Sequence, residues 1–431
     1  MCNSNRLPVR PRDDGLSGTK SSRAFRGPPF NRPIPRGRCV FVTIAGRFQR
    51  QCPKGCHAVD RSLPGASMHL QRAPAPISSV CTAPVCVAPV RATPLRCALL
   101  AVLSLACLLA SEFPATAAML RTGQVTAGGA ESFAGAMIDE LETALRDEKA
   151  DLVLRRLARG EAGDAKPEAF EPEALWDRLT TGRVDIAALP LAAATSSDPI
   201  FGAASMPGLA RRHADADALA QSAFMADLKT HLDNAGMIVL ADAWLAGGFV
   251  SSGACLEGPP STAGKTLHAE GEPLRTILTK SGASVARAPR ARLAAALAGG
   301  VIDGALASSS VLADPELARA AKCLTAPGSD ALWFSYEPIV IARPSWEALS
   351  DDERAALKAA GDKVTAWAAR ESRAQDDRLV QIYRKAGAEV EEMPRSALDQ
   401  WLAVAVESSW RDFARDVKDG KRLLAEAITG D

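Results

Sequence analysis

The sequence predicts an α/β protein with two lobes, and three observations carry this prediction. Residues 264–304 alternate short apolar runs with short helical patterns, which is typical of a parallel sheet covered by helices. The 314 residues that follow Ala117 are enough for two lobes with separate cores. A helical pattern at 351–386 would extend on the order of 54 Å, which is longer than one small lobe.

The segment 264–304 is the most informative part of the chain. Parallel strands present their carboxyl ends as a crevice in which ligands bind, so this segment predicts a lobe that holds a ligand. In chain order we expect a strand at 266–269, a helix at 272–280 closed by Ser281 and Gly282, a strand at 283–288, an alanine-rich helix from Pro289 to Gly299 and Gly300, and a third strand that begins at Val301.

Periodicity and turn residues predict the other elements. The long helix begins with a capping box at Ser350 and Glu353, places Leu357 and Val364 on one face, and stops at Gly387. Elsewhere we expect strands at 120–126, 151–158, 184–189, 237–243 and 339–342, helices at 131–146 and 173–180, a loop at 161–172, a crossover between the lobes at 244–248, and a strand with closing helices at 388–431.

Charge divides the chain into two unlike parts. The whole chain has a net charge of +1, but the part after Ala117 holds 35 basic and 46 acidic residues, a net of −11. Nucleic-acid binding requires the opposite sign, so we expect no nucleic acid as a partner.

The first 117 residues predict an export signal behind an irregular extension. Residues 1–90 show no sustained period and predict disorder. Residues 91–117 combine two arginines, an apolar run at 97–110 and an A-x-A site at 115–117, the pattern of a signal peptide. We expect a mature protein that begins near Ala118 in the periplasm; the alternative is an uncleaved anchor.

A signal peptide normally starts a chain, whereas this one begins about ninety residues into the sequence. We therefore expect that translation starts later, for example at Met68, and that much of 1–67 is an erroneous extension.

Motifs for catalysis or cofactors are lacking. The three histidines after Ala117 have no partner at metal-ligand spacing, and 258–266 has one residue too many and two prolines where a phosphate loop needs N–H donors. Cys52, Cys56 and His57 exceed the haem-attachment spacing by one residue. We expect no enzyme, metal or cofactor. Cys255 and Cys323 are either a disulfide or two separate thiols.

The order and spacing of several segments resemble the solute-binding proteins of tripartite ATP-independent periplasmic (TRAP) transporters, the dicarboxylate-binding, DctP-like type. In that family a Gly-Leu-Lys-Ile-Arg-Val-like strand precedes a Gly-Ala segment and a helix that ends Ala-Leu-x-x-Gly-Val-Val-Asp-Gly. Here 264–269, 282–283 and 296–304 occupy these places. The helix, glycine and aspartate-containing strand at 175–186 and the loop at 206–209 are also similar to the family's.

The resemblance implies a type II-like periplasmic binding protein with hinged parallel and mixed sheets and a long C-terminal helix that bridges the lobes. It places the first lobe at 118–246 with about 333–350, and the second at 247–332 with about 351–431. It implies a subunit that captures a small solute, for example an organic acid, between the lobes and delivers it to TRAP membrane subunits. The alternatives are a degenerate member that acts as a periplasmic sensor or interaction protein and, third, an enzyme.

Departures from the family pattern bear on the ligand. Where the family has arginines that clamp a carboxylate, this sequence has His268 and Val250; Ala307 and Arg292 replace its usual Asn and Glu. The candidate ligand-binding residues are His268, which would donate when protonated, Arg287, which would supply a charge, Ser308 with its neighbours to Ser310 as hydroxyl donors, and Trp244, Trp333 and Tyr336 as pocket walls. Each also has a purely structural interpretation, as a core or surface residue.

Overall fold

The computed structural model describes residues 41–44, 47–50, 118–125, 132–157 and 171–429. Residues 1–91 form one unit and 92–431 another. In the first unit, strand β1 (Phe41–Ile44) pairs antiparallel with β2 (Arg47–Arg50), within the range where the sequence showed no periodic pattern. The signal peptide expected at 91–117 and most of the loop expected at 161–172 lie outside the described residues.

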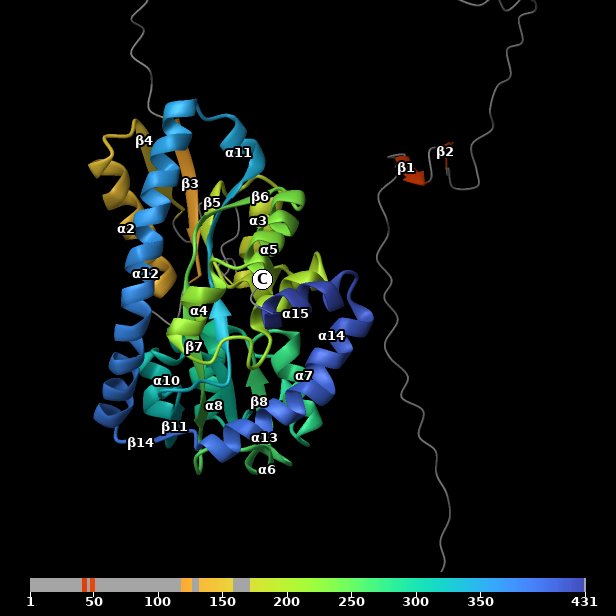
Figure 1. The fold of residues 1–431 in the computed structure, drawn as a ribbon, viewed down its shortest axis with the longest axis vertical. Coiled ribbons are helices and arrows are strands. Elements are labelled where there is room, and N and C mark those ends of the chain that lie inside the picture. Colours follow the sequence, from red (N-terminus) through yellow and green to blue (C-terminus); the bar gives the residue numbers. More distant parts are fainter. Residues whose placement is uncertain (1–40, 45–46, 51–117, 126–131, 158–170, 430–431) are drawn as a thin grey trace, which may run out of the picture. The chain divides into compact units, whose positions relative to one another are not determined.

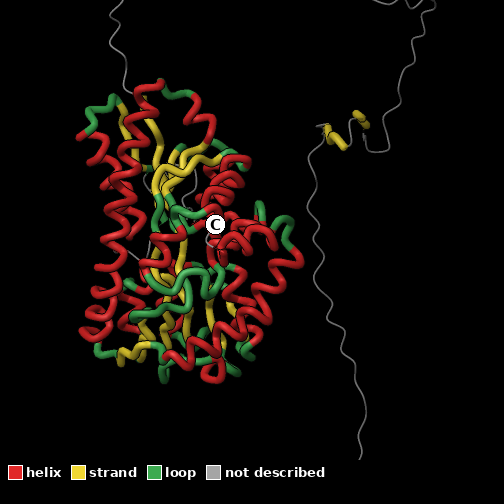
Figure 2. The backbone as a smooth tube through the Cα atoms, in the orientation of Figure 1, coloured by secondary structure: helices red, strands yellow, loops and turns green. Residues whose placement is uncertain are grey.

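The second unit contains two sheets, with helices packed around them (Figure 2). The first sheet has the order β4-β3-β5-β13-β6, in which β3 is parallel to β4 and β5, and β13 is antiparallel to β5 and β6. Its strands are β3 (Ala118–Gln124), β4 (Leu152–Arg156), β5 (Ile186–Ala188), β6 (Met237–Ala241) and β13 (Ile339–Ala342).

The second sheet has the order β14-β11-β7-β10-β8-β9, with β12 paired to the start of β7. Strand β8 is parallel to β9 and β10, whereas β7 is antiparallel to β10, β11 and β12. The strands are β7 (Trp244–Ser251), β8 (Thr266–Ala269), β9 (Ser284–Ala286), β10 (Gly304–Ser308), β11 (Cys323–Ala326), β12 (Phe334–Tyr336) and β14 (Glu389–Glu392).

Alternate residues of the central strands enter cores on opposite faces of each sheet. Ile186 and Ala187 of β5 belong to different cores, and so do Leu306 and Ala307 of β10. Because successive side chains of a strand point to opposite faces, each sheet is covered on both sides. This mixed α/β arrangement of two sheet-centred lobes is the fold class that the sequence predicted.

The expected alternation in 264–304 is confirmed, with one shift. Helix α7 (Glu272–Lys280), a 3-10 turn η4 (Arg290–Arg292) and helix α8 (Leu293–Ala298) separate the strands. The third strand begins at Gly304, three residues later than expected from Val301. The N–H groups of Val301 and Ile302 both donate to the carbonyl of Ala296 at the C-terminal end of α8. These two N–H groups are therefore not available for pairing in the sheet.

Helix α12 (Asp351–Ala386) contacts elements of both sheets and runs beside them (Figure 1). Its bounds are those that the sequence predicted: Ser350 and Glu353 form the capping box, and Gly387 ends the helix with φ +84°. A Cβ on Gly361 would lie 2.0 Å from the carbonyl oxygen of Leu240, so only glycine permits this close approach to β6.

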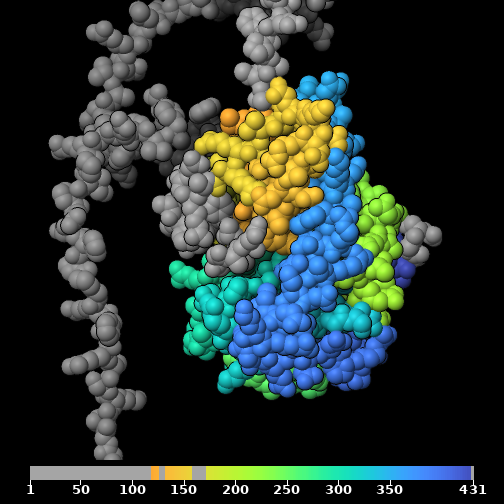
Figure 3. Space-filling model, turned by 90° about the vertical axis from the view of Figure 1, so that its left-hand side faces the viewer, coloured from red at the N-terminus to blue at the C-terminus, as the bar shows by residue number. Residues whose placement is uncertain are grey.

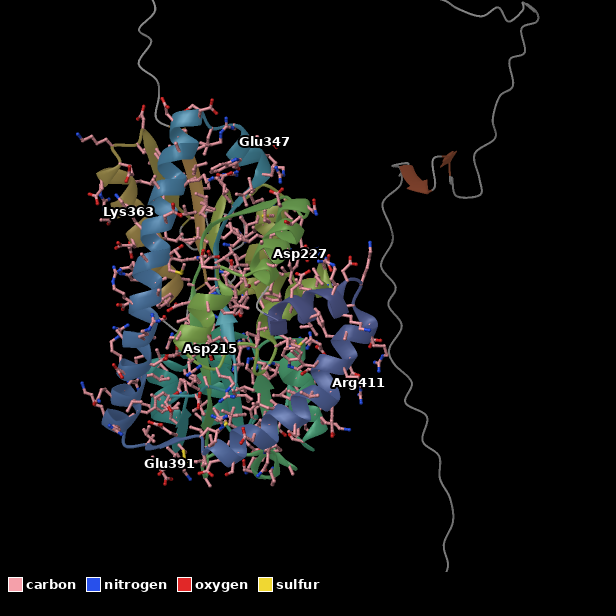
Figure 4. All side chains as sticks on the ribbon, in the orientation of Figure 1. Asp215, Asp227, Glu347, Lys363, Glu391 and Arg411 are labelled. Atoms are coloured by element: carbon pink, nitrogen blue, oxygen red, sulfur yellow. A yellow bond between two sulfur atoms is a disulfide. The ribbon has the colours of Figure 1, made fainter. Side chains whose placement is uncertain are left out.

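The surface of α12 also borders the segment that carries β3, β4 and helix α2 (Phe133–Asp147), as Figure 3 shows. Lys363, labelled in Figure 4, donates from Nζ to Glu148 Oε1 at 2.6 Å across this contact. This helix therefore braces the first lobe at one end and the second lobe at the other.

Besides α12, two adjoining short connections carry the chain between the sheets. The sequence placed a crossover at 244–248, but these residues belong to β7, because Trp244–Ala246 pair with β12. The passage lies instead at Asp242 and Ala243, beside Glu337, whose N–H donates to the carbonyl of Ala243 at 2.9 Å. Strand β12 and the start of β7 therefore pair within the second sheet, although the sequence analysis placed both in the first lobe. The expected boundaries of the lobes stay a prediction.

Cys255 and Cys323 form a disulfide with Cα atoms 5.2 Å apart, which decides between the two alternatives left by the sequence. The bond ties the loop after β7 to the start of β11. No helix in the described ranges combines the length and apolar character of a membrane span.

The remaining elements are α3 (Pro172–Thr180), η2 (Leu191–Ser196), η3 (Pro199–Ser205), α4 (His213–Leu219), α5 (Ala223–Asn234), α6 (Pro259–Thr262), α9 (Ser309–Leu312), α10 (Pro315–Ala320), α11 (Arg343–Glu347), α13 (Arg395–Ala405), a π-helical turn η5 (Val406–Trp410), α14 (Arg411–Asp416) and α15 (Gly420–Thr429).

Candidate functional site

A cavity of about 400 Å³ lies between segments of the two lobes. The first lobe contributes the start of α3 and the segment that follows β5. The second lobe contributes the carboxyl ends of β8 and β9, part of α7 and β12. The lining residues are Glu171, Pro172, Glu173, Pro190, Ala192, Ala193, Thr195, Ser196, His268, Ala269, Glu270, Gly271, Arg275, Arg287, Ala288, Pro289, Arg290, Trp333 and Ser335.

The deepest charge in this wall is Arg290. Its side chain is 9% exposed, and Nη2 donates to Oε1 of Glu270, whose side chain is 10% exposed. Burial alone would lower the pKa of Arg290, but Glu270, Glu337 and Glu171 outweigh it and hold that pKa above its ordinary value. Arg290 therefore stays charged. Within the described residues its guanidinium hydrogen bond is the one from Nη2, which leaves Nε, Nη1 and the second N–H of Nη2 for another acceptor.

Glu270 is held from two sides, because its Oε2 also accepts the N–H of Ser308 at 2.7 Å. Behind it lies Glu337, which is 2% exposed and accepts hydrogen bonds from the hydroxyls of Ser308 at 3.1 Å and Ser310 at 3.2 Å. Burial raises the pKa of Glu337; Arg290 opposes this and Glu270 adds to it. The wall thus contains one buried guanidinium and two buried carboxyl groups.

His268, near the end of β8, is also buried in this wall. Its Nδ1 accepts the N–H of Ala288 at 3.3 Å. Burial lowers the pKa of the imidazole, with the charge of Glu270 opposing. Burial therefore favours the neutral imidazole, in which Nε2 carries the proton when Nδ1 accepts from Ala288, whereas the role of His268 as a donor in the protonated form stays a prediction.

Contacts cross the cavity at Glu171, which precedes α3 in the first lobe. Its Oε2 accepts the N–H of Arg290 at 3.1 Å, and its Oε1 accepts the N–H of Ala291 at 3.3 Å. Both acceptor–donor pairs join the two lobes directly.

Two further arginines reach the cavity from the second lobe. Arg275 donates from Nε to Glu272 Oε2 at 2.9 Å. Arg287 is 79% exposed and its Nη2 lies 3.9 Å from the same carboxylate. Both arginines therefore share the exposed carboxylate of Glu272 as their counter-charge, and Arg287 lies at the rim of the cavity.

Trp333 forms an apolar part of the wall and is itself buried. A Cβ on Gly247 would lie 1.9 Å from the indole Nε1, so the ring lies directly on the β7 backbone. Among the described residues the indole N–H has no hydrogen-bond partner.

The family "Bacterial extracellular solute-binding protein, family 7", also called DctP, matches residues 166–416 of this chain. The chain belongs to this family. It is a solute-binding protein of the TRAP type, as the resemblance implied.

Individual relatives agree with this membership. A solute-binding protein of Albidiferax ferrireducens is 26% identical over 258 residues, which cover 60% of this chain and 76% of that protein. A TRAP periplasmic solute-binding protein of Rhodoferax ferrireducens with bound malonate has a TM-score of 0.67 at 23% identity, covering 72% of this chain and 98% of the other. A Bordetella pertussis extracytoplasmic solute receptor that binds pyroglutamic acid has a TM-score of 0.64 at 17% identity, covering 72% and 100%. The similarity to these two solved structures shows that this chain shares their fold.

Three of the six residues that the sequence analysis named for this TRAP-type protein line the cavity together: His268, Arg287 and Trp333. Ser308 lies beneath the wall, where its N–H and hydroxyl bind Glu270 and Glu337.

The other two named residues lie near the connection between the lobes. The rings of Trp244 and Tyr336 pack with centroids 4.8 Å apart, and the Tyr336 hydroxyl donates to Asp242 at 2.5 Å. Neither lines the main cavity, and Trp244 borders a small separate hollow instead.

The sequence analysis missed Glu171, Glu270, Arg275 and Arg290. The rule that ligands bind at the carboxyl ends of parallel strands could have found two of them, because Glu270 directly follows β8 and Arg290 lies four residues beyond β9. Glu171 carries no such signal, since its role depends on how the two lobes meet.

One group of potential metal ligands was found in the described ranges, formed by Cys255, Cys323 and Glu389. The two sulfur atoms are bonded to each other and so offer no thiolate to a metal.

Proposed function

We propose that this protein captures a small organic acid between its lobes in the periplasm and delivers it to the membrane subunits of a TRAP transporter. The observation that carries the proposal is the buried Arg290 in the wall of a cavity of solute size, with a pair of adjacent N–H groups, one of them on Nη2, that no described residue engages. A guanidinium binds carboxylates through two parallel hydrogen bonds, and such charge-assisted bonds are strong where water is excluded.

Other features of the cavity support the same proposal. His268 supplies a neutral N–H donor, Trp333 an apolar wall, and Arg275 and Arg287 a positive rim. The relatives with bound malonate and pyroglutamic acid supply precedent for carboxylates as ligands within the fold. The alternative of a degenerate protein that only senses or interacts has less support, because it does not account for a buried arginine in a cavity.

The proposal assigns ligand contacts to a set that differs from the sequence-based one. Arg290, His268 and Trp333 contact the solute directly, and Arg275 and Arg287 attract it to the rim. Ser308 acts through Glu270 and Glu337, whereas Trp244 and Tyr336 support the connection between the lobes. The relatives are solute-binding proteins, and we propose that this chain likewise has no catalytic activity.

Thermal unfolding tests the proposal on protein recovered from the periplasm of an expressing bacterium. A ligand at one hundred times its Kd stabilises the folded state by about 2.7 kcal/mol, which raises Tm by several degrees. We expect this with at least one of a panel of mono- and dicarboxylates and sugar acids, and we expect Arg290→Lys to abolish most of the shift. Arg292→Lys, an exposed arginine outside the cavity, is the matched control. No shift with any acid would refute the proposal.

Export is tested on the same material by mass spectrometry. We propose that the signal peptide at 91–117 is removed, so the mature protein should begin near Ala118. A mature N-terminus before residue 90 would refute this cleavage, and one before residue 68 would also refute a translation start at Met68.

A further inference from the structure

Among the described residues, the buried carboxyl groups around the cavity equal or outnumber its buried cation, Arg290. We infer that the cavity selects solutes with a single carboxylate over solutes with two, and that Glu270 sets this limit. This inference rests on the proposed function, because it concerns the class of acid that the same cavity accepts.

The buried wall of the cavity contains both a positive charge and carboxyl groups. Arg290 contributes one positive charge and Glu270 one negative charge, and both side chains are about nine-tenths buried. Glu337 adds a second buried carboxyl group behind them. Even when Glu337 holds a proton, the part of the buried wall that the structure describes has no surplus positive charge.

Arg275, Arg287 and His268 are the other groups of the described wall that could neutralise a second ligand carboxylate. Arg275 is already paired with Glu272, and Arg287 is 79% exposed, so water screens its charge. His268 is neutral near pH 7 because of its burial. A solute with one carboxylate can use the remaining N–H groups of Arg290, but a second carboxylate in the closed cavity would lack a counter-charge among the described residues. Burying an unpaired charge is costly, so the dicarboxylate should bind more weakly.

Glu270 is held in place by hydrogen bonds to both of its carboxylate oxygens. Arg290 holds its Oε1, and the backbone N–H of Ser308 holds its Oε2 at 2.7 Å. The backbone N–H is fixed by β10, which pairs with β8 on one side and β7 on the other. Glu270 therefore stays beside Arg290 while a solute binds, and this makes it the residue that determines specificity.

Matched ligands that differ by one charge test this inference. Malonate and succinate are compared with their monoamides, malonamate and succinamate, by isothermal titration calorimetry at pH 7. We expect the monoamide of each pair to bind at least tenfold more tightly. Glu270→Gln removes the buried negative charge and retains an acceptor for Ser308, so it should shift the ratio of the two Kd values at least tenfold towards the dicarboxylate.

Glu391→Gln is the control, since this residue is exposed to water and lies outside the cavity; its ratio of the two Kd values should match that of the wild type. If Glu270→Gln does not fold, as judged by its melting curve, Glu337→Gln is compared with the wild type at pH 8, where more of the buried Glu337 carboxyl group is ionised, and should shift the ratio in the same direction. Dicarboxylates that bind as tightly as their monoamides, or an unchanged ratio in the variants, would overturn the inference and leave the proposed function standing. Absence of binding by any of these acids and by the wider panel would overturn both.

Discussion

The carboxylate of Glu171 accepts the backbone N–H of Arg290 at 3.1 Å, although the two residues are 119 positions apart and belong to different lobes. Because the second oxygen of Glu171 accepts the N–H of Ala291 at 3.3 Å, one side chain ties the lobes together at the mouth of the cavity. A binding protein that closes around its solute needs contacts of this kind in the closed state, and their strength affects how quickly the solute leaves.

Glu171→Ala should loosen the closed state. Hydrogen bonds to charged groups contribute about 2 kcal/mol, so the closed form should lose roughly 30-fold in population relative to the open one. Hydrogen–deuterium exchange measures this without knowledge of the ligand, because the amides of Arg290 and Ala291 lose their acceptor and should exchange faster. Glu173→Ala, two residues along, is the control and should leave both amides protected. Equal exchange in the two variants would contradict the role assigned to Glu171.

The disulfide should contribute strongly to the stability of the second lobe. Cys255 and Cys323 are 68 residues apart, and closing a loop of that length restricts the unfolded chain by about 4 kcal/mol. We expect Cys255→Ser with Cys323→Ser to lower the free energy of unfolding by about 2–4 kcal/mol in urea titrations. Reduction of the wild type with dithiothreitol should lower it similarly and should not affect the double variant. A double variant as stable as the wild type would be the contrary result.

Gly361→Ala should disrupt the contact between α12 and the first sheet. The new Cβ would meet the carbonyl oxygen of Leu240 at 2.0 Å, a backbone atom that cannot rotate away. Overpacking of this kind costs about 1–3 kcal/mol, although alanine is the better helix former by about 1 kcal/mol. Urea unfolding should therefore show a net loss, whereas Asp362→Ala at the exposed neighbouring position should stay within about 0.5 kcal/mol of the wild type. A stabilised Gly361→Ala would show that α12 can move away from β6.

The elements that the sequence predicted best depend on local chemistry. The bounds of α12 follow from the capping box at Ser350 and from Gly387, and the parallel strands β8 and β9 follow from apolar runs separated by helical patterns. The site was predicted only in part, because it depends on contacts between distant segments. Arg287 stood out as a charge near the end of a strand, yet it is exposed, whereas Arg290 owes its burial to Glu270 and to the approach of the first lobe.

Gly247→Ala should move Trp333 out of the cavity wall. The added Cβ would lie 1.9 Å from the indole Nε1, so the ring must leave its place on β7. We expect a red shift of the tryptophan emission and a loss of at least tenfold in affinity for whichever acid the thermal panel identifies. Gly253→Ala is the matched control, because its Cβ would have only the Ser251 hydroxyl nearby, at 3.9 Å. An unchanged emission spectrum would show that Trp333 tolerates the extra methyl group.

Glu337 should make the folded state less stable as the pH rises. Burial raises the pKa of this carboxyl group in the folded protein above its ordinary value of 4.5, so the folded state holds the proton more tightly than the unfolded chain does. The stabilisation from this group is therefore complete below pH 4.5 and is lost as the pH increases through the folded-state pKa. Glu337→Gln cannot ionise and still offers an oxygen to the hydroxyls of Ser308 and Ser310. The difference in unfolding free energy between Glu337→Gln and the wild type, measured in urea from pH 4 to pH 8, should grow in favour of the variant as pH rises. A difference that stays constant over this range would mean that Glu337 ionises equally easily in both states and that Arg290 fully compensates its burial.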